Sequence, residues 1–273
     1  MGAGMNVEAW QRRIARAREL AARYAFAAEI LEFYAAIARF QAKLYGEIGN
    51  STLVQEITAD ADPFAKNLDP RILKDFPELL RMVAENAPEK LSETAGELGR
   101  RDEKSHFELL AEFWGGNRRE NSSDGAHDFF ARAFLQPYAA AVRERAKLKW
   151  NGPTPYVCPF CKRKPGLGVL RPLGEGGQRL LICSFCLGEW EFRRILCPGC
   201  GEGDPAKLPV YSAEELEHMR VEGCDSCKTY IKTVDFTKSA LGEPIVDEIA
   251  SVPLDLWAQE RGYRKLQVNL MQL

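Results

Sequence analysis

The sequence predicts an α+β fold in which a helical N-terminal half is followed by a cysteine-rich half with short β-hairpins. All eight cysteines of the 273-residue chain lie after residue 150. Before that point, apolar residues recur at steps of three and four, as they do on amphipathic helices. A segment rich in proline and glycine, residues 151–155, separates the two patterns. We therefore expect a helical bundle domain over residues 1–150 and a second domain over residues 151–273.

The first half is predicted to form a bundle of about five helices. Its apolar stripes cover residues 29–44, 70–87, 104–114 and 124–150, with a break at Gln41 in the first of them. Proline at positions 70 and 88 is typical of helix starts, and the glycine pair at 115–116 is typical of a helix end. The aromatic residues of these stripes are expected to fill a core, and a groove for a partner is the alternative.

The cysteines form four C-x-x-C pairs with none left over: Cys158/Cys161, Cys183/Cys186, Cys197/Cys200 and Cys224/Cys227. Two thiolates at this spacing sit on one tight turn, so two such turns supply the four ligands of a tetrahedral metal site. The first cysteines of the first and third pairs lie 39 positions apart. This repeat indicates an internal duplication of a metal-binding ribbon.

The spacing between the pairs predicts which turns combine. Ribbon sites usually separate their pairs by about 15–20 residues. Sequential pairing leaves 21 and 23 intervening residues, whereas joining the second pair to the third leaves only 10. We therefore predict two tandem rubredoxin-like or zinc-ribbon modules. Their ligands would be Cys158, Cys161, Cys183 and Cys186 in site one, and Cys197, Cys200, Cys224 and Cys227 in site two.

Four thiolates in a tetrahedron suit zinc, and they also suit a single iron. With every coordination position filled by sulfur, neither metal has an opening for water or substrate, so a structural or one-electron role is expected. Redox-active dithiols are the alternative, but a thioredoxin-like pair opens a helix after a strand, and no helical pattern follows Cys161, Cys186 or Cys200.

The turns themselves are expected to differ in detail. Gly201 follows the third pair and would accept a positive φ, which frees backbone N–H groups to point at sulfur. Lys162 and Lys228 stand at the same place in the first and fourth turns. Basic residues beside the pairs, Arg194 among them, are expected either to offset thiolate charge or to be ordinary solvated surface.

Strands are expected at residues 179–182, 189–196 and 229–236, with a turn at 174–177 and a short helix at 212–220. The tail from residue 245 to 273 begins with an apolar helical pattern, has Pro253 near a helix start and has a cap at Gly262. We interpret this tail as a helical brace packed against the ribbons.

Composition limits the functional classes. A formal net charge of −2 gives no basic field for nucleic acid, and no apolar run is long enough to span a membrane. The arginine-rich start does not resemble an export signal, so we expect a cytoplasmic protein, where metal thiolates are favoured over disulfides. His106, His127 and His218 are expected to be surface or packed residues, and no lone cysteine is left as a nucleophile. No catalytic residue is predicted, and an enzyme is disfavoured.

At the level of motifs, the chain resembles a known family. The strings Cys-Pro-Phe-Cys at Cys158, Cys-Pro-Gly-Cys-Gly at Cys197 and Cys-Asp-Ser-Cys at Cys224 are similar to those of the formate dehydrogenase accessory protein family FdhE. Residues 134–138 (Phe-Leu-Gln-Pro-Tyr) and the ending around residues 254–256 and 262–263 are similar too. The resemblance covers essentially the whole chain, and its most specific element is the cysteine spacing.

The resemblance implies a cytoplasmic maturation factor, or chaperone, needed for the activity of respiratory molybdenum-containing formate dehydrogenases. Its implied partner is the catalytic subunit of that enzyme, and its implied cofactors are two mononuclear metal ions. Iron is favoured by the family's rubredoxin-like sites, with zinc possible. A rubredoxin-like electron carrier is an alternative, and a zinc-ribbon nucleic-acid module is a further one that the near-zero charge argues against.

Aromatic residues beside the cysteines have two interpretations. If Phe160, Phe185 and Trp190 are exposed, they would form a docking surface for a client protein. If they are buried, they pack between the ribbons, as small metal domains require of their apolar residues.

Overall fold

The computed structural model describes residues 7–48, 51, 52, 54, 56, 62–65, 68–116, 125–146, 150, 152, 154–239 and 241–273. The chain divides into two compact units. The helical unit comprises residues 1–15, 32–148 and 272, and the sheet unit comprises residues 16–31, 149–271 and 273. Asn151 and Pro153, in the segment expected to separate the two halves, lie outside the described residues.

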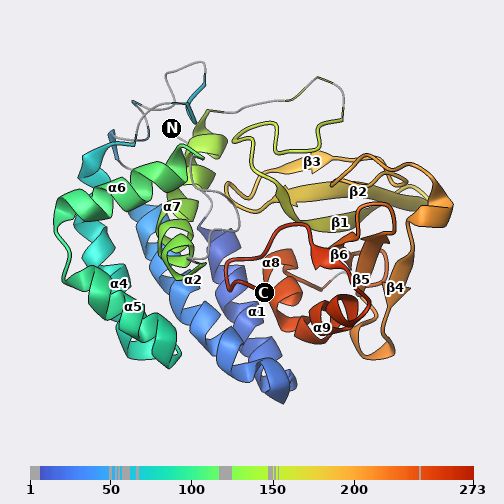
Figure 1. The fold of residues 1–273 in the computed structure, drawn as a ribbon, viewed down its shortest axis with the longest axis horizontal. Coiled ribbons are helices and arrows are strands. Elements are labelled where there is room, and N and C mark those ends of the chain that lie inside the picture. The colour runs from blue at the N-terminus through green and yellow to red at the C-terminus, as the bar shows by residue number, and fades with distance from the viewer. Residues whose placement is uncertain are drawn as a thin grey trace. The chain divides into compact units, whose positions relative to one another are not determined.

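The α-helices described in the first 146 residues (Figure 1) are α1 (Glu8–Arg23), α2 (Ala28–Ile48), α4 (Phe76–Asn86), α5 (Glu89–Gly99), α6 (Glu103–Trp114) and α7 (Gly125–Arg145). Short 3-10 helices cover Ala25–Ala27 and Pro70–Asp75. The helical stripes expected at residues 29–44, 70–87 and 104–114 are confirmed. The fourth stripe forms α7, which ends at Arg145.

Helix α7 is the centre of the helical unit, because its side chains are buried without interruption from Asp128 to Val142. Pro137 lies inside it and has no N–H, so the carbonyl of Ala133 has no donor four residues later. The side chain of Gln41 on α2 donates to that carbonyl at 2.8 Å. Gln41, the polar break in the apolar stripe of α2, therefore replaces the hydrogen bond that Pro137 removes from α7.

The sheet unit contains β1 (Pro165–Leu173), β2 (Gly176–Cys183), β3 (Glu189–Glu191), β4 (Val210–Ser212), β5 (Met219–Cys224), β6 (Thr229–Asp235) and β7 (Arg264–Lys265). They form one sheet with the order β3-β2-β1-β6-β5-β4, and β7 pairs with β6 (Figure 1). After β6 the unit contains α8 (Pro244–Ala250) and α9 (Val252–Glu260), and 3-10 turns lie at Pro205–Lys207 and Glu214–Leu216.

The order of elements in the sheet unit is duplicated. In each half a cysteine turn leads into two strands, a second cysteine turn follows, and a third strand completes an antiparallel set: β1-β2-β3 and then β4-β5-β6. The sets are joined where β1 runs parallel to β6, with Gly168 opposite Thr233. The expected α+β class with tandem ribbons is confirmed, and the two ribbons share one sheet.

Two local expectations need correction. The helix expected at residues 212–220 is wrong, because a 3-10 turn separates β4 from β5 there. Met219, Val221 and Gly223 are buried while Arg220 and Glu222 between them are half-buried, which is the two-residue period of a strand. The strand expected at 189–196 ends at Glu191, because the chain leaves the sheet to reach Cys197.

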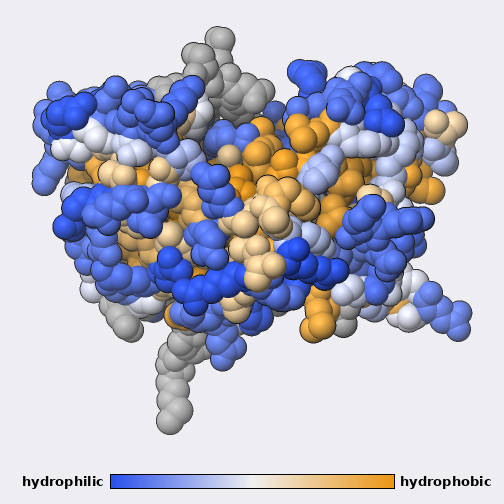
Figure 2. Space-filling view, turned by 90° about the horizontal axis from the view of Figure 1, so that it is seen from below, coloured by the Kyte–Doolittle hydropathy of each residue, from blue (hydrophilic) through white to orange (hydrophobic). Residues whose placement is uncertain are grey.

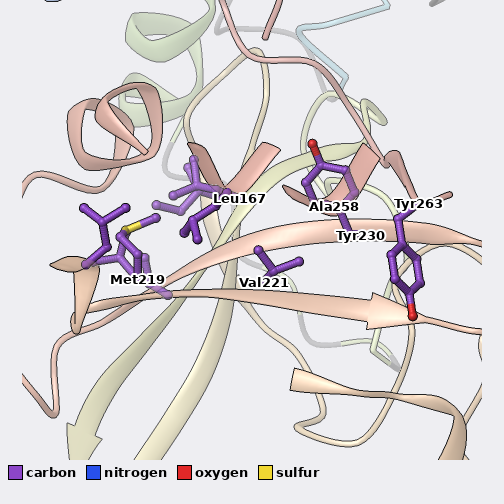
Figure 3. Packing of buried hydrophobic residues seen from close by; sticks show 11 residues of the cluster. Leu167, Met219, Val221, Tyr230, Ala258 and Tyr263 are labelled. Carbon is purple, nitrogen blue, oxygen red and sulfur yellow. The ribbon is translucent and has the colours of Figure 1, made fainter. Parts of the chain in front are cut away.

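One face of the sheet packs on the C-terminal helices, as the expected brace requires. Leu167 of β1, Val221 of β5 and Tyr230 of β6 form a buried cluster with Ala258 of α9 and Tyr263 (Figure 3). Gly262 ends α9 with φ of 78°, which a left-handed helix cap demands.

A buried ion network also links α8 and α9 to β6. Lys232 is fully buried and contacts Asp255 at 2.5 Å and Glu248 at 3.2 Å. Lys265 contacts the same two carboxylates, and Asn269 donates to Glu248 at 2.7 Å. Two positive and two negative side chains thus neutralise each other in a site that excludes water. Buried charges are tolerated when they are paired in this way.

Among the described residues, no helix has the length and the apolar character that a membrane span requires. On the face drawn in Figure 2, hydrophilic residues cover much of the surface and hydrophobic residues show between them.

The joint between β1 and β6 requires glycine at position 168. A Cβ atom there would collide with Oγ1 of Thr233, whose side chain is fully buried. We expect Gly168→Ala to lower the free energy of unfolding by about 1–3 kcal/mol, as measured by denaturant unfolding of the metal-loaded protein.

Gly203→Ala is the matched control for that substitution, because nothing lies within 4 Å of its added Cβ. It should change the stability by less than about 0.5 kcal/mol. Adding Thr233→Ala to Gly168→Ala should recover part of the loss. Equal stability of Gly168→Ala and the wild type would show that the joint does not have this geometry.

The ion network predicts a pH-dependent contribution to stability. Burial opposes ionisation of Glu248, but Lys232 and Lys265 lower its pKa from 4.5 to about 2. A lowered folded-state pKa means that the carboxylate stabilises the fold above pH 4.5, and that this contribution is lost as the pH falls toward 2. Glu248→Gln should therefore cost about 3 kcal/mol at neutral pH, and the gap to the wild type should close on acidification.

Denaturant unfolding of the Glu248→Gln variant and the wild type at a series of pH values measures that gap, so that effects common to both proteins cancel. Glu19→Gln, at an exposed ion pair of the same unit, should cost less than about 1 kcal/mol. A gap that is constant across the acid range would contradict the assignment to Glu248.

Candidate metal centres

The structure brings the eight cysteines together in two groups of four. Cys158, Cys161, Cys183 and Cys186 form one group, and Cys197, Cys200, Cys224 and Cys227 form the other. Within each group all sulfur atoms lie within 4.8 Å of one another. All eight are free cysteines. The grouping is the sequential one: the two cysteine turns of each module contribute to the same site.

Each group sits at the end of its module's hairpin. The turn of Cys158 precedes β1, and Cys183 is the last residue of β2, so the antiparallel register that places Pro165 opposite Cys183 also brings the two turns together. In the second module Cys224 is the last residue of β5 and Cys227 precedes β6, with Cys224 opposite Thr229. Strand pairing therefore contributes to the positions of the sulfurs in both modules.

All four turns share one backbone conformation. The residue after each second cysteine has a positive φ: 63° at Lys162, 57° at Leu187, 81° at Gly201 and 53° at Lys228. In the first turn, Lys162 N–H donates to the carbonyl of Cys158 at 3.0 Å, and Gly201 N–H donates to that of Cys197 at 3.0 Å. The expected difference between the turns is thus one of side chain only. A positive φ costs a residue other than glycine about 1–3 kcal/mol. Lys162, Leu187 and Lys228 adopt it because the turn requires it.

The sulfur positions fit a tetrahedral ion. A metal–sulfur bond of about 2.3 Å places the sulfurs of a regular tetrahedron ~3.8 Å apart. Across site one, Cys158 and Cys186 are 3.5 Å apart, and Cys161 and Cys183 are 3.3 Å apart. Across site two, the distances are 3.7 Å for Cys197 to Cys227 and 3.6 Å for Cys200 to Cys224. Four soft sulfur donors in this arrangement suit zinc or iron.

Backbone donors stabilise negative charge on the sulfurs. Phe185 N–H donates to the sulfur of Cys183 at 3.3 Å, and Gly199 N–H donates to that of Cys197 at the same distance. Burial raises the pKa of the Cys183 and Cys186 thiols well above the usual value. Thiolates buried in this way need a cation beside them, because an unpaired charge out of water is unfavourable. Without a cation these two thiols would stay neutral, and a bound metal ion is what would allow them to ionise.

The two sites differ in exposure. In site one, Cys158, Cys183 and Cys186 are fully buried and Cys161 is half-buried. In site two, Cys200 is exposed and Cys227 is half-buried. Burial opposes ionisation of Cys227, but hydrogen bonds from the side chain and backbone of Thr229 lower its pKa to about 7. Site two is thus the more accessible of the two to solvent and to other molecules.

The aromatic residues beside the sites pack inside the unit. Phe185 is 2% exposed and Trp190 is 5% exposed, and the indole N–H of Trp190 donates to the carbonyl of Pro155 at 3.0 Å. The docking surface considered for these residues is therefore wrong for Phe185 and Trp190, and the packing interpretation holds. Phe160 is half-buried.

The histidines lie outside both cysteine groups. His106 is buried, and its Nε2 lies 2.7 Å from the carbonyl of Leu98. His218 pairs with Asp247 at 2.8 Å, and Asp247 also accepts from Arg16 at 2.6 Å. Among the described residues, the two cysteine sets are the groups of three or more potential ligands that could hold a metal ion.

Fold and site together define a class: a helical protein that ends in two duplicated ribbon modules, each with a four-cysteine cluster able to hold a metal ion. The family model described as FdhE, central domain, matches residues 157–194, and the model for FdhE, C-terminal domain, matches residues 195–272. The boundary between them falls between β3 and Cys197, where the duplication divides the sheet unit.

Similarities over most of the chain agree with these domains. A protein FdhE homolog from Aquifex aeolicus is 33% identical over 201 residues, which are 73% of this chain and 69% of that protein. A protein FdhE from Escherichia coli O1:K1 / APEC is 28% identical over 274 residues, covering 95% and 86%. The chain belongs to the FdhE family. This membership supports the expectation of a formate dehydrogenase accessory protein.

A solved structure shows the same fold. The crystal structure of the FdhE protein from Pseudomonas aeruginosa matches with a TM-score of 0.74 and 24% identity, covering 97% of this chain and 96% of that one. The helical half and the tandem ribbons thus occur together in a related protein.

The difference in exposure predicts two rates of metal loss. With both sites loaded, a coloured chelator should remove one metal ion per chain quickly and the second slowly, because ligand exchange needs access to sulfur. Cys200 of site two is exposed, whereas Cys161, the most accessible ligand of site one, is half-buried. Absorbance of the chelator complex against time measures the two phases. Cys200→Ser should abolish the fast phase and leave the slow one.

Cys183→Ser is the matched substitution in site one, where it should abolish the slow phase. A single rate for both ions, or loss of the slow phase in Cys200→Ser, would contradict the prediction.

Proposed function

We propose that this chain is a maturation factor that binds the catalytic subunit of a respiratory molybdenum-containing formate dehydrogenase in the cytoplasm and is needed for its activity. The observation that carries the proposal is membership of the FdhE family together with two complete four-cysteine groups. We further propose two functional domains, a helical bundle over residues 1–150 and a metal-binding domain over residues 151–273, although residues 16–31 group with the sheet unit.

The eight cysteines are proposed to bind two mononuclear metal ions, with iron favoured by the family resemblance over zinc. Such an ion would hold the two turns of a module together and, if it is iron, would exchange single electrons. Four sulfurs fill the coordination sphere, so no position is left to activate water. We therefore propose that the chain does not itself oxidise formate and acts through its partner.

One observation favours a second function, rubredoxin-like electron transfer. Cys200 is exposed at site two, so an electron donor or acceptor can approach that cluster directly. Iron at site two would give a visible absorption spectrum that bleaches on reduction and returns on oxidation. A colourless protein with two zinc ions would exclude this function while leaving the maturation role intact.

A pull-down combined with metal analysis tests the maturation proposal. Tagged wild-type chain should retain the catalytic subunit from native cytoplasm, and the same sample should contain two metal ions per chain, one for each cysteine group. A host that lacks the chain should lose most of its formate dehydrogenase activity and regain it with the wild-type gene. The purified chain alone should leave formate unchanged.

Cys183→Ser removes a fully buried ligand, so this variant should lose metal and fail to restore activity. Glu19→Gln, at an exposed ion pair, serves as the control and should behave as the wild type. Normal enzyme activity in the host without the chain would overturn the proposal.

A further inference from the structure

The second face of the sheet, opposite the face that packs on α9, carries a cavity of about 440 Å³. On β5 the residues that alternate with the buried core point to it, so Arg220, Glu222 and Cys224 line its wall. Arg179 of the first module lines it as well, together with the segment that connects the modules. The cavity therefore belongs to both modules and adjoins the cysteines of site two.

The cavity contains more positive than negative charge. Arg179 contacts Glu222 at 2.5 Å, and Arg220 donates to the other oxygen of the same carboxylate at 3.1 Å. Arg220 also lies 3.6 Å from Asp235. Arg194 lines the cavity, is exposed, and has no ion-pair partner within the described part of the chain. One guanidinium is thus left to bind a carboxylate from elsewhere.

Arg179 adds a second unmatched donor. Its side chain is 3% exposed, and it donates to the carbonyls of Arg193 and Leu196 at 2.9 and 3.0 Å. Its Nε has no hydrogen-bond partner in the structure. The wall of the cavity thus contains a buried guanidinium with one donor unmatched, which is unfavourable.

The mouth of the cavity is apolar. Ile195 is 51% exposed and Val210 is 57% exposed, and both line the cavity. Val210 begins β4, which is the last strand at this end of the sheet. An end strand offers backbone donors and acceptors to an extended segment, and neighbouring apolar side chains give such a segment its specificity. A small inorganic anion would leave this apolar mouth in water.

We propose that this cavity binds an extended segment of the client protein in which an acidic side chain lies next to aliphatic ones. The carboxylate contacts Arg194, and the aliphatic side chains cover Ile195 and Val210. This inference rests on the proposed function, because it takes the client to be the formate dehydrogenase catalytic subunit. It places the client beside site two, where the exposed Cys200 also lies.

Two substitutions at the mouth test the proposal without removing a buried contact. Arg194→Glu reverses the unpaired charge, and Val210→Asp makes the apolar rim acidic. Each should weaken binding of the purified catalytic subunit about tenfold or more, measured by titration with the whole metal-loaded chain. Lys238→Glu makes the same charge change, and Leu173→Asp the same apolar-to-acidic change, at exposed positions outside the cavity lining. Both should bind as the wild type does.

Overlapping synthetic peptides that span the catalytic subunit provide a second readout. The wild type should capture peptides that place Asp or Glu beside Leu, Ile or Val, and Arg194→Glu should lose them. Metal content and thermal unfolding of each variant establish that it is folded.

The outcomes separate this inference from the proposed function. If the subunit binds the wild type and the cavity variants equally, or if no acidic-aliphatic peptide is captured, the cavity proposal is wrong and the maturation role stands. If the subunit does not bind but acidic-aliphatic peptides are captured through Arg194, the cavity proposal holds and the client is another protein. If neither binds, both proposals fall.

Discussion

The parallel pairing of β1 with β6 is the interaction on which the rest of the sheet unit depends. Each ribbon module alone is a three-stranded antiparallel set with a cysteine group at one end, too small to bury a core of its own. Joining the two edges through Gly168 and Thr233 makes one sheet with two usable faces. One face can then carry α8 and α9, and the other can form a cavity with walls from both modules.

The same joint explains why the duplicated modules are not equivalent. Their four turns share a positive φ angle after the second cysteine, so the backbone that carries the sulfurs is alike in the two groups. Their surroundings differ, because site one is enclosed by the packing around Phe185 and Trp190, whereas site two leaves Cys200 in solvent. Duplication followed by different packing is a physical route to one site that mainly holds the fold and another that meets a partner.

Buried charge is arranged differently in two parts of the sheet unit. The network of Lys232, Glu248, Asp255 and Lys265 is balanced and closed, which suits a role in holding helices on the sheet. At the cavity, Glu222 is shared by two arginines and Arg194 is left over. A balanced buried network stabilises a structure, and an unbalanced one at an open cavity attracts a ligand of the opposite charge.

The sequence by itself determined the features that depend on local spacing: the helical stripes, the tight C-x-x-C turns, the sequential grouping of the cysteines and the cap at Gly262. These follow from the period of a helix and from the geometry of a few consecutive residues, which composition and order record directly. Only the tertiary structure decided that the ribbons share a sheet and that residues 212–220 contribute to strands. It also decided that Gln41 donates to the carbonyl left without a donor by Pro137, and that Arg179 forms an ion pair with Glu222. Each of these features brings together residues that are distant along the chain. A single sequence does not show which distant residues are close in space.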